Sequence, residues 1–140
     1  MSAWRPGTVR NGRPVSAHAR AYDRGVVTDV FAGIAVTEYG VAVRWYERLW
    51  GAAPAFLPHE TEAVWEIAEH RFVYVVQRPE HAGHAMHTIF VDDLDAVVAG
   101  IGERGVEPVG RETYGDGVRK VIFRDPDGNE IGFGGAPSSP

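Results

Sequence analysis

Histidine and carboxylate side chains are the groups here that could bind a metal or transfer a proton, and their placement limits that chemistry. The sequence holds six histidines and no cysteine, which excludes thiolate metal sites, disulfide bonds and a catalytic thiol. His84 and His87 lie three residues apart at the start of an apolar strand pattern, where this spacing points them to opposite sides. The other four are scattered through expected loops, so no Ser-His-Asp arrangement can be assigned. We favour surface or interface positions for the histidines over metal ligation.

A tight turn at 125–128 precedes the most promising carboxylate. In Asp125-Pro-Asp-Gly128, proline fixes φ at a turn position, the aspartates bond nearby backbone, and glycine supplies a left-handed residue. These residues predict a β-hairpin between strands at 121–124 and 130–134.

Glu130 and Tyr74 are the candidate catalytic residues. A glutamate surrounded by aromatic rings at the start of the last strand could act as a general base or bind a cationic ligand. The alternative for Glu130 is an exposed position, paired with Arg124 or Lys120. Tyr74, within an apolar strand pattern, could orient a ligand through its hydroxyl.

The elements that position these residues occur as two copies of one pattern, 55 residues apart. Short apolar strands at 31–36 and 86–91 are followed by helical spacing of apolar residues, with Thr37 and Asp92 as expected N-caps. Gly51 and Gly105 stand where the helices should end. Three strands are expected after each helix, around 55–57, 63–68 and 72–77, then around 106–109, 118–124 and 130–134. Each half therefore reads βαβββ.

Composition predicts one globular domain. The 140 residues are 44% hydrophobic and 11% aromatic, and no apolar run has the length of a membrane span. The net charge of −5 divides into +3 for residues 1–29 and −8 for the remainder. We expect residues 1–29 to form a flexible basic arm, or else to pack across the domain or a partner. The acidic body argues against nucleic-acid binding. Without an apolar secretory leader, we expect a cytoplasmic protein.

The paired units, the helix start at 91–96 and the turn at 125–129 resemble the vicinal oxygen chelate superfamily, which includes glyoxalase I, extradiol dioxygenases and bleomycin-resistance proteins. The resemblance covers roughly residues 31–137. It implies a single α+β domain at 30–137, with modules at about 30–79 and 85–137 whose curved mixed sheets enclose a groove. It also implies a homodimer, in which some family members exchange modules between chains.

The resemblance further implies four metal-ligand positions, on the first and last strand of each module. They fall at Phe31 and Met86, where histidine is usual, and at Tyr74 and Gly132, where glutamate is usual. None is a good ligand for a divalent metal, so we predict no metal and no cofactor. A shift of one residue would turn His87 instead of Met86 into the groove.

Aromatic and apolar side chains are expected to line the groove instead. Alternate residues of the strands at 31–36, 72–77 and 86–91 are expected to share one face. The strand at 63–68 adds Trp65. The alternative is that these side chains simply fill a core. The predicted ligand-binding residues are Phe31, Trp65, Phe72, Tyr74, Met86, Thr88, Phe90 and Glu130.

Three functions are compatible with the sequence, and the first two use the groove. The favoured hypothesis is a metal-free protein of the bleomycin-resistance kind that binds an apolar or aromatic small molecule. The alternative is a lyase, isomerase or cyclase, either cofactor-independent with Glu130 and Tyr74 or dependent on a metal whose ligands are not recognised. The third is an interaction module that uses the basic arm. The sequence leaves open whether any reaction is catalysed.

Overall fold

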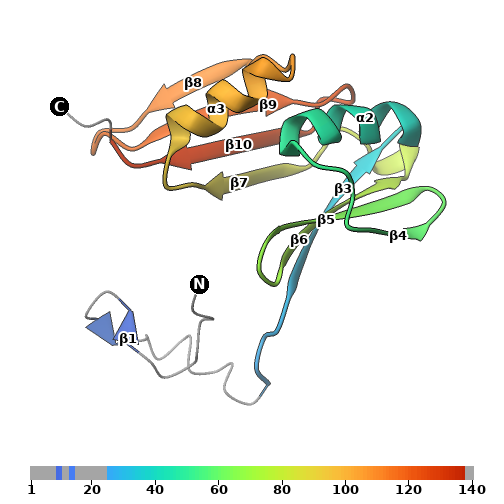
Figure 1. The fold of residues 1–140 in the computed structure, drawn as a ribbon, viewed down its shortest axis with the longest axis horizontal. Coiled ribbons are helices and arrows are strands. Elements are labelled where there is room, and N and C mark those ends of the chain that lie inside the picture. The colour runs from blue at the N-terminus through green and yellow to red at the C-terminus, as the bar shows by residue number, and fades with distance from the viewer. Residues whose placement is uncertain (1–8, 11–12, 15–24, 138–140) are drawn as a thin grey trace.

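The computed structural model describes residues 9–10, 13–14 and 25–137, and two βαβββ modules follow one another along the chain (Figure 1). The first consists of β3 (Val30–Val36), α2 (Tyr39–Trp50), β4 (Phe56–His59), β5 (Glu62–Ala68) and β6 (Arg71–Gln77). After η2 (Pro79–His81), the second consists of β7 (Met86–Phe90), α3 (Leu94–Glu103), β8 (Gly110–Thr113), β9 (Arg119–Arg124) and β10 (Glu130–Gly135).

Upstream of the modules, the short strands β1 (Val9–Arg10) and β2 (Arg13–Pro14) pair with each other in antiparallel fashion. Most of the expected arm at 1–29 lies outside the described residues, so its flexibility stays a prediction.

Each module closes into its own four-stranded mixed sheet. The strand orders are β3-β6-β5-β4 and β7-β10-β9-β8. The first and last strands of each module are parallel, and the remaining neighbours are antiparallel. The β9–β10 hairpin closes at the predicted turn, where Gly128 adopts φ 94° and its amide donates to the Asp125 carbonyl at 2.9 Å. The predicted α+β fold with two modules is therefore confirmed.

One hydrophobic core runs through both modules, on the side of the sheets that the helices cover (Figure 1). The apolar stripe of α2 supplies Tyr46 and Leu49, which are 0% and 2% exposed, and α3 supplies Leu94 and Ile101. Side chains at alternate positions of the strands meet them because a strand points successive residues to opposite faces. Among the described residues, no helix is long and apolar enough to cross a membrane.

The helix starts differ from the expectation by one residue each. The N-cap of α2 is Glu38 rather than Thr37, and its side chain makes no capping hydrogen bond. Distant side chains serve this helix start instead, since Asp127 accepts from the Thr37 amide at 3.0 Å and Gln77 accepts from the Tyr39 amide at 3.0 Å. Ordinary local capping occurs in α3.

Asp93, rather than the expected Asp92, caps α3 by accepting from the Ala96 amide at 3.1 Å. The strand expected at 106–109 begins only at Gly110. The Val106 amide donates to the Ile101 carbonyl at the end of α3, so it is not available to a strand ladder. Val106 is buried in the core as part of the connection.

A buried polar cluster joins the 125–129 turn to the first module. The Asp125 side chain accepts from the Tyr46 hydroxyl on α2 and from the Asn129 amide group, both at 2.8 Å. Asn129 also donates to the Ala35 carbonyl on β3 at 2.8 Å and accepts from the Ala85 amide at 2.9 Å. Asp125 and Asn129 are 5% and 0% exposed. The turn of the second module therefore holds both a helix and an edge strand of the first.

We predict that Tyr46→Phe destabilises the fold by about 1.5–3 kcal/mol at pH 7, because the buried Asp125 carboxylate loses a hydroxyl donor. Urea unfolding measures the change. Tyr39→Phe is the control, since no described residue bonds the Tyr39 hydroxyl.

The contribution of Tyr46 to stability is expected to fall at alkaline pH. Burial and the neighbouring Asp125 carboxylate raise the pKa of Tyr46 in the folded chain. The unfolded chain releases this proton near pH 10, while the folded chain retains it. The contribution of Tyr46 is therefore fully present below about pH 10 and falls by about 1.4 kcal/mol per pH unit above it. A difference between wild type and Tyr46→Phe that stays constant up to pH 11 would contradict this account.

Candidate ligand-binding site

Each sheet leaves the face opposite its helix open. On β6, Val73 and Val75 are 3% and 0% exposed, whereas the alternate residues stay partly exposed. On β7, Met86 and Phe90 are 73% and 64% exposed. We call these surfaces the open faces. The first open face carries Phe31, Gly33, Ala35, Phe72, Tyr74 and Val76, and the second carries Met86, Thr88, Phe90, Glu130, Gly132 and Gly134.

The structure brings most of the predicted ligand-binding residues together in two groups. Phe31, Phe72 and Tyr74 share the first open face, as strand pairing aligns Phe31 with Phe72. The other group shares the second open face and consists of Met86, Thr88, Phe90 and Glu130. Their role as ligand contacts remains a prediction.

Aromatic rings make the first open face flat. The rings of Phe31 and Phe72 stack with centroids 4.4 Å apart and an interplanar angle of 7°. Phe56, which the sequence did not single out, packs edge-on against Phe72 at 6.4 Å. Phe31 and Phe56 are 48% and 46% exposed, so these rings offer a planar surface for stacking.

A cavity at the first open face adds polar groups to this surface. It has a volume of about 360 Å³ and is lined by Gly33, Ala35, Glu62, Tyr74, Arg78 and His81. A cavity of about 420 Å³ lies where the edge strands of the two modules meet, and its lining joins Phe72 and Phe90 to residues of the helix-covered side such as Val73 and Trp50. A ligand could therefore combine ring stacking with hydrogen bonds to a few polar side chains.

Neighbouring side chains fill the space above three glycines of the open faces. A Cβ atom on Gly33 would lie 2.6 Å from the Tyr74 hydroxyl oxygen, and one on Gly134 would lie 3.0 Å from the Phe90 ring. A Cβ atom on Gly132 would lie 2.5 Å from Cε of Lys120. The glycines thus allow large side chains to lie flat on the sheet, and Tyr74, Phe90 and Lys120 occupy the room that the missing Cβ atoms leave.

Two cations surround Glu130. Its carboxylate lies 3.2 Å from Nη2 of Arg124 and 3.6 Å from Nζ of Lys120, and Glu130 is only 8% exposed. Both predicted partners are thus present, although the glutamate is buried rather than exposed. Glu130 and Tyr74 lie on different sheets, so one chain does not bring the two candidate catalytic residues together.

The four family metal positions do not form a ligand set. They hold a phenyl ring, a phenol, a thioether and a glycine, and Lys120 lies over the glycine. An ammonium group beside a divalent cation is unfavourable. No cluster of three histidine or carboxylate side chains that could hold a metal occurs within the part of the chain that the structure describes. The residues at these positions do not fit a metal.

His84 and His87, before and within β7, do not form a ligand pair. Met86, with 73% exposure, faces the open side, so the one-residue shift that would turn His87 into the groove does not occur. His87 instead places Nε2 3.1 Å from the Gly33 carbonyl oxygen, which links β7 to β3. His84 is exposed before the strand. His87 therefore has a position between the modules rather than in the groove.

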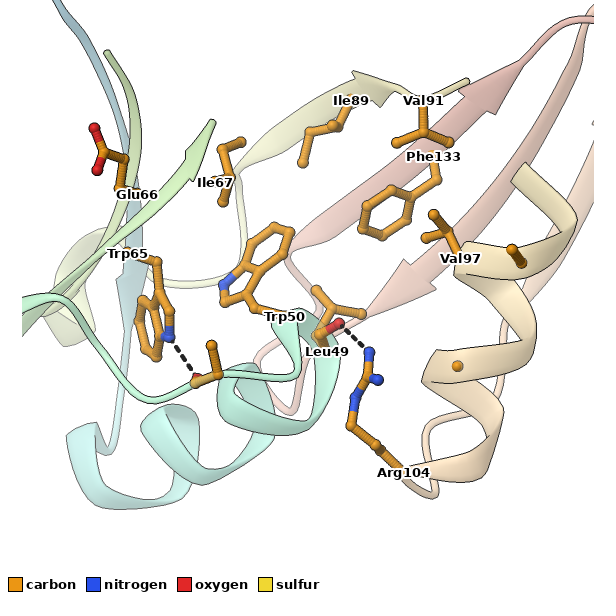
Figure 2. Close-up of a pocket in the computed structure, with 13 residues that line it drawn as sticks. Leu49, Trp50, Trp65, Glu66, Ile67, Ile89, Val91, Val97, Arg104 and Phe133 are labelled. Atoms are coloured by element: carbon orange, nitrogen blue, oxygen red, sulfur yellow. Dashed lines mark hydrogen bonds between the residues drawn. The ribbon is translucent and has the colours of Figure 1, made fainter. Parts of the chain in front are cut away.

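Trp65 lies on the opposite side of its sheet from the other predicted ligand residues. It is 2% exposed, pairs with Val73 on the helix-covered face, and donates from Nε1 to the Ala52 carbonyl at 2.9 Å. The expectation that it shares the open face is wrong. Residues 63–65 of β5 are all buried, so alternation could not tell the two faces apart. Trp65 instead lines a separate cavity between the modules (Figure 2).

Arg104 links the ends of α2 and α3, and no sequence pattern predicted this contact. Its guanidinium donates to the backbone carbonyls of Arg48 and Leu49, the second at 3.1 Å. It therefore satisfies carbonyl groups at the end of α2 from the end of α3. This bond fixes how the two helices meet beside the Trp65 cavity.

We predict that Glu130→Gln lowers the free energy of unfolding by about 1–2 kcal/mol, since it leaves Lys120 and Arg124 close together without their shared carboxylate. Chemical denaturation at low and moderate salt measures the loss. Glu107→Gln, at an exposed glutamate between α3 and β8 to which no described residue bonds, is the matched control and should change stability by less than about 0.5 kcal/mol. Equal losses in both variants would contradict the described ion pairs.

Comparison with known proteins identifies the family. The family model described as the glyoxalase/bleomycin resistance protein/dioxygenase superfamily matches residues 28–133. A glyoxalase/bleomycin resistance protein from Catenulispora acidiphila DSM 44928 is 60% identical, with a TM-score of 0.75 over 78% of this chain and 98% of that one. Comparison with curated proteins found no match.

Two more distant structures have the same fold. TnmS3, an antibiotic binding protein from Streptomyces sp. CB03234, is 25% identical, with a TM-score of 0.61 over 81% of this chain and 98% of that one. A lactoylglutathione lyase from Agrobacterium tumefaciens is 15% identical, with a TM-score of 0.60 over 76% and 92% of the two chains. On the family match and the two-module fold, this chain belongs to the glyoxalase/bleomycin resistance protein/dioxygenase superfamily.

Proposed function

We propose that this protein binds an apolar or aromatic small molecule on its open faces, without a metal. One observation carries the proposal, namely the uncovered apolar surface of Phe31, Met86 and Phe90, which are 48%, 73% and 64% exposed. Large exposed apolar residues on each of the two open faces favour a binding site there. The stacked pair of Phe31 and Phe72 favours a planar ligand.

The names of two similar proteins support small-molecule binding. TnmS3 is described as an antibiotic binding protein, and it is 25% identical over most of both chains. The Catenulispora protein bears the name of the glyoxalase/bleomycin resistance group. An antibiotic or similar natural product with fused rings is a ligand that would match the flat aromatic surface of this chain.

The chemistry of the open faces favours binding without a metal. The four family positions offer no good ligand set, and the Lys120 stem lies over Gly132. Glu130, the nearest carboxylate, is already paired with two cations. A ligand held here would be recognised by ring contacts, with Tyr74, Arg78 and Glu62 as polar partners at the first open face.

We further propose that two chains form a homodimer in which the open faces enclose the ligand. Small-molecule sites bury most of the ligand surface, which a single flat sheet face does not achieve. A second copy would cover Met86 and Phe90, which are exposed in one chain. It could also bring Glu130 of one chain near Tyr74 of the other, so a reaction that used both residues would require the dimer.

Ligand binding is tested by calorimetric titration of chelator-treated protein with bleomycin and a panel of planar aromatic antibiotics. We predict saturable binding of at least one compound without added metal. Phe31→Ala should weaken it by about tenfold or more, because it removes a ring of the stacked pair. Val109→Ala is the control, since Val109 is 61% exposed but precedes β8 outside both open faces. Binding that requires a transition metal would refute the proposal.

The dimer is tested by sedimentation equilibrium. We predict that wild type is dimeric and that Met86→Glu shifts it toward monomer, because a buried unpaired carboxylate would be strongly unfavourable at the interface. Val109→Glu introduces the same charge at another exposed apolar residue and should leave the dimer intact. A monomeric wild type, or equal effects of both substitutions, would argue against pairing through the open faces.

A further inference from the structure

A further cavity lies on the helix-covered side of the sheets and adjoins the one at the edge strands. It has a volume of about 340 Å³ and opens between α2, α3 and the strands that face them (Figure 2). Its apolar lining includes Trp50, Trp65, Ile67, Ile89, Val97 and Phe133. Protein interiors are close-packed, and unfilled spaces of this size are uncommon. The cavity is therefore large enough for a small organic molecule.

Trp50 gives this cavity a polar group without a partner. The indole nitrogen of Trp50 is buried, and no described residue accepts its hydrogen. Trp65, in the same cavity, donates its indole hydrogen to the Ala52 carbonyl at 2.9 Å. Figure 2 shows the Trp50 ring between Trp65 and Phe133, with its nitrogen on the edge toward Trp65. A buried N–H group without an acceptor is unfavourable, and native structures rarely leave one.

The other polar side chains at the cavity are already engaged. Arg104 donates to the carbonyls of Arg48 and Leu49. Glu66 accepts from the backbone amide of His70 at 3.3 Å. The lining described here thus needs one acceptor, supplied from outside the protein. Its two charged side chains, Glu66 and Arg104, bond to backbone groups rather than to the Trp50 nitrogen. This requirement defines the kind of molecule that fits.

From these observations we infer a second binding site, for a small uncharged apolar molecule that carries one hydrogen-bond-accepting oxygen, such as a cyclic or aromatic ketone. The rings of Trp50, Trp65 and Phe133 contact its apolar body. Its carbonyl oxygen accepts from the Trp50 indole N–H once the Trp50 ring shifts toward the cavity, because that nitrogen is buried in the structure. The inference does not rest on a ligand at the open faces, since Phe31, Tyr74 and Met86 do not line this cavity. The cavity shares Trp50, Ile67 and Ile89 with the cavity at the edge strands.

The test uses 1-indanone and indane, which share one bicyclic skeleton and differ in the carbonyl oxygen. Nitrogen-15 NMR of the full chain resolves the indole signals of its four tryptophans, and Trp50→Phe assigns one of them. We expect 1-indanone to shift the Trp50 proton signal downfield in a saturable manner. Indane should bind about fivefold more weakly, as the loss of one neutral hydrogen bond implies. Trp50→Phe should bind both compounds equally.

A matched pair of helix variants locates the site. Ala96 and Ala99 are both exposed on α3, but only Ala96 lines the cavity. Ala96→Phe should abolish the 1-indanone shift, and Ala99→Phe should retain it. The inference is overturned if 1-indanone gives no saturable shift up to its solubility limit. It is also overturned if indane binds wild type as tightly, or if the shift persists in Ala96→Phe.

Discussion

The buried carboxylate of Asp125 is the interaction on which the arrangement of the two modules depends. It accepts hydrogen bonds from Tyr46 of the first module and from Asn129 of its own turn, and Asn129 continues the cluster to Ala35 and Ala85. Because Asp125 and Asn129 are 5% and 0% exposed and Tyr46 is 0% exposed, water does not readily replace a lost partner in this cluster. The cluster therefore fixes the position of α2 and β3 relative to β10, and with them the position of the open faces.

The open faces follow from how each module uses its one helix. A four-stranded sheet has two faces, and a single helix covers one of them, so the other is left for a ligand or a second chain. Phe31, Phe72 and Phe56 make this surface aromatic on the first module, while Met86 and Phe90 extend it on the second. The proposed site is thus a surface that folding leaves uncovered, rather than a cavity in the core.

The sequence predicted the features that arise from local pattern. The 55-residue repeat, Gly51 and the turn at 125–128 specify the two modules because each depends on residues close together in the chain. Contacts between residues far apart in the chain were not predicted. The start of α2 is served by Asp127, 90 residues away from Thr37, so local capping rules misplaced it by one residue.

The open-face residues were predictable wherever one face of a strand is exposed, as on β6 and β7. Trp65 was not, because β5 is buried on both faces at 63–65. Trp50 and Arg104 gave no signal because their roles arise only where α2 and α3 meet. The Lys120 stem over Gly132 was equally hidden, and it has an evolutionary consequence. A Cβ atom at position 132 would lie 2.5 Å from Lys120 Cε, so a carboxylate there requires the Lys120 stem to move off the sheet. The displaced ammonium group would then compete with a metal for that carboxylate, so the two positions are expected to change together among relatives.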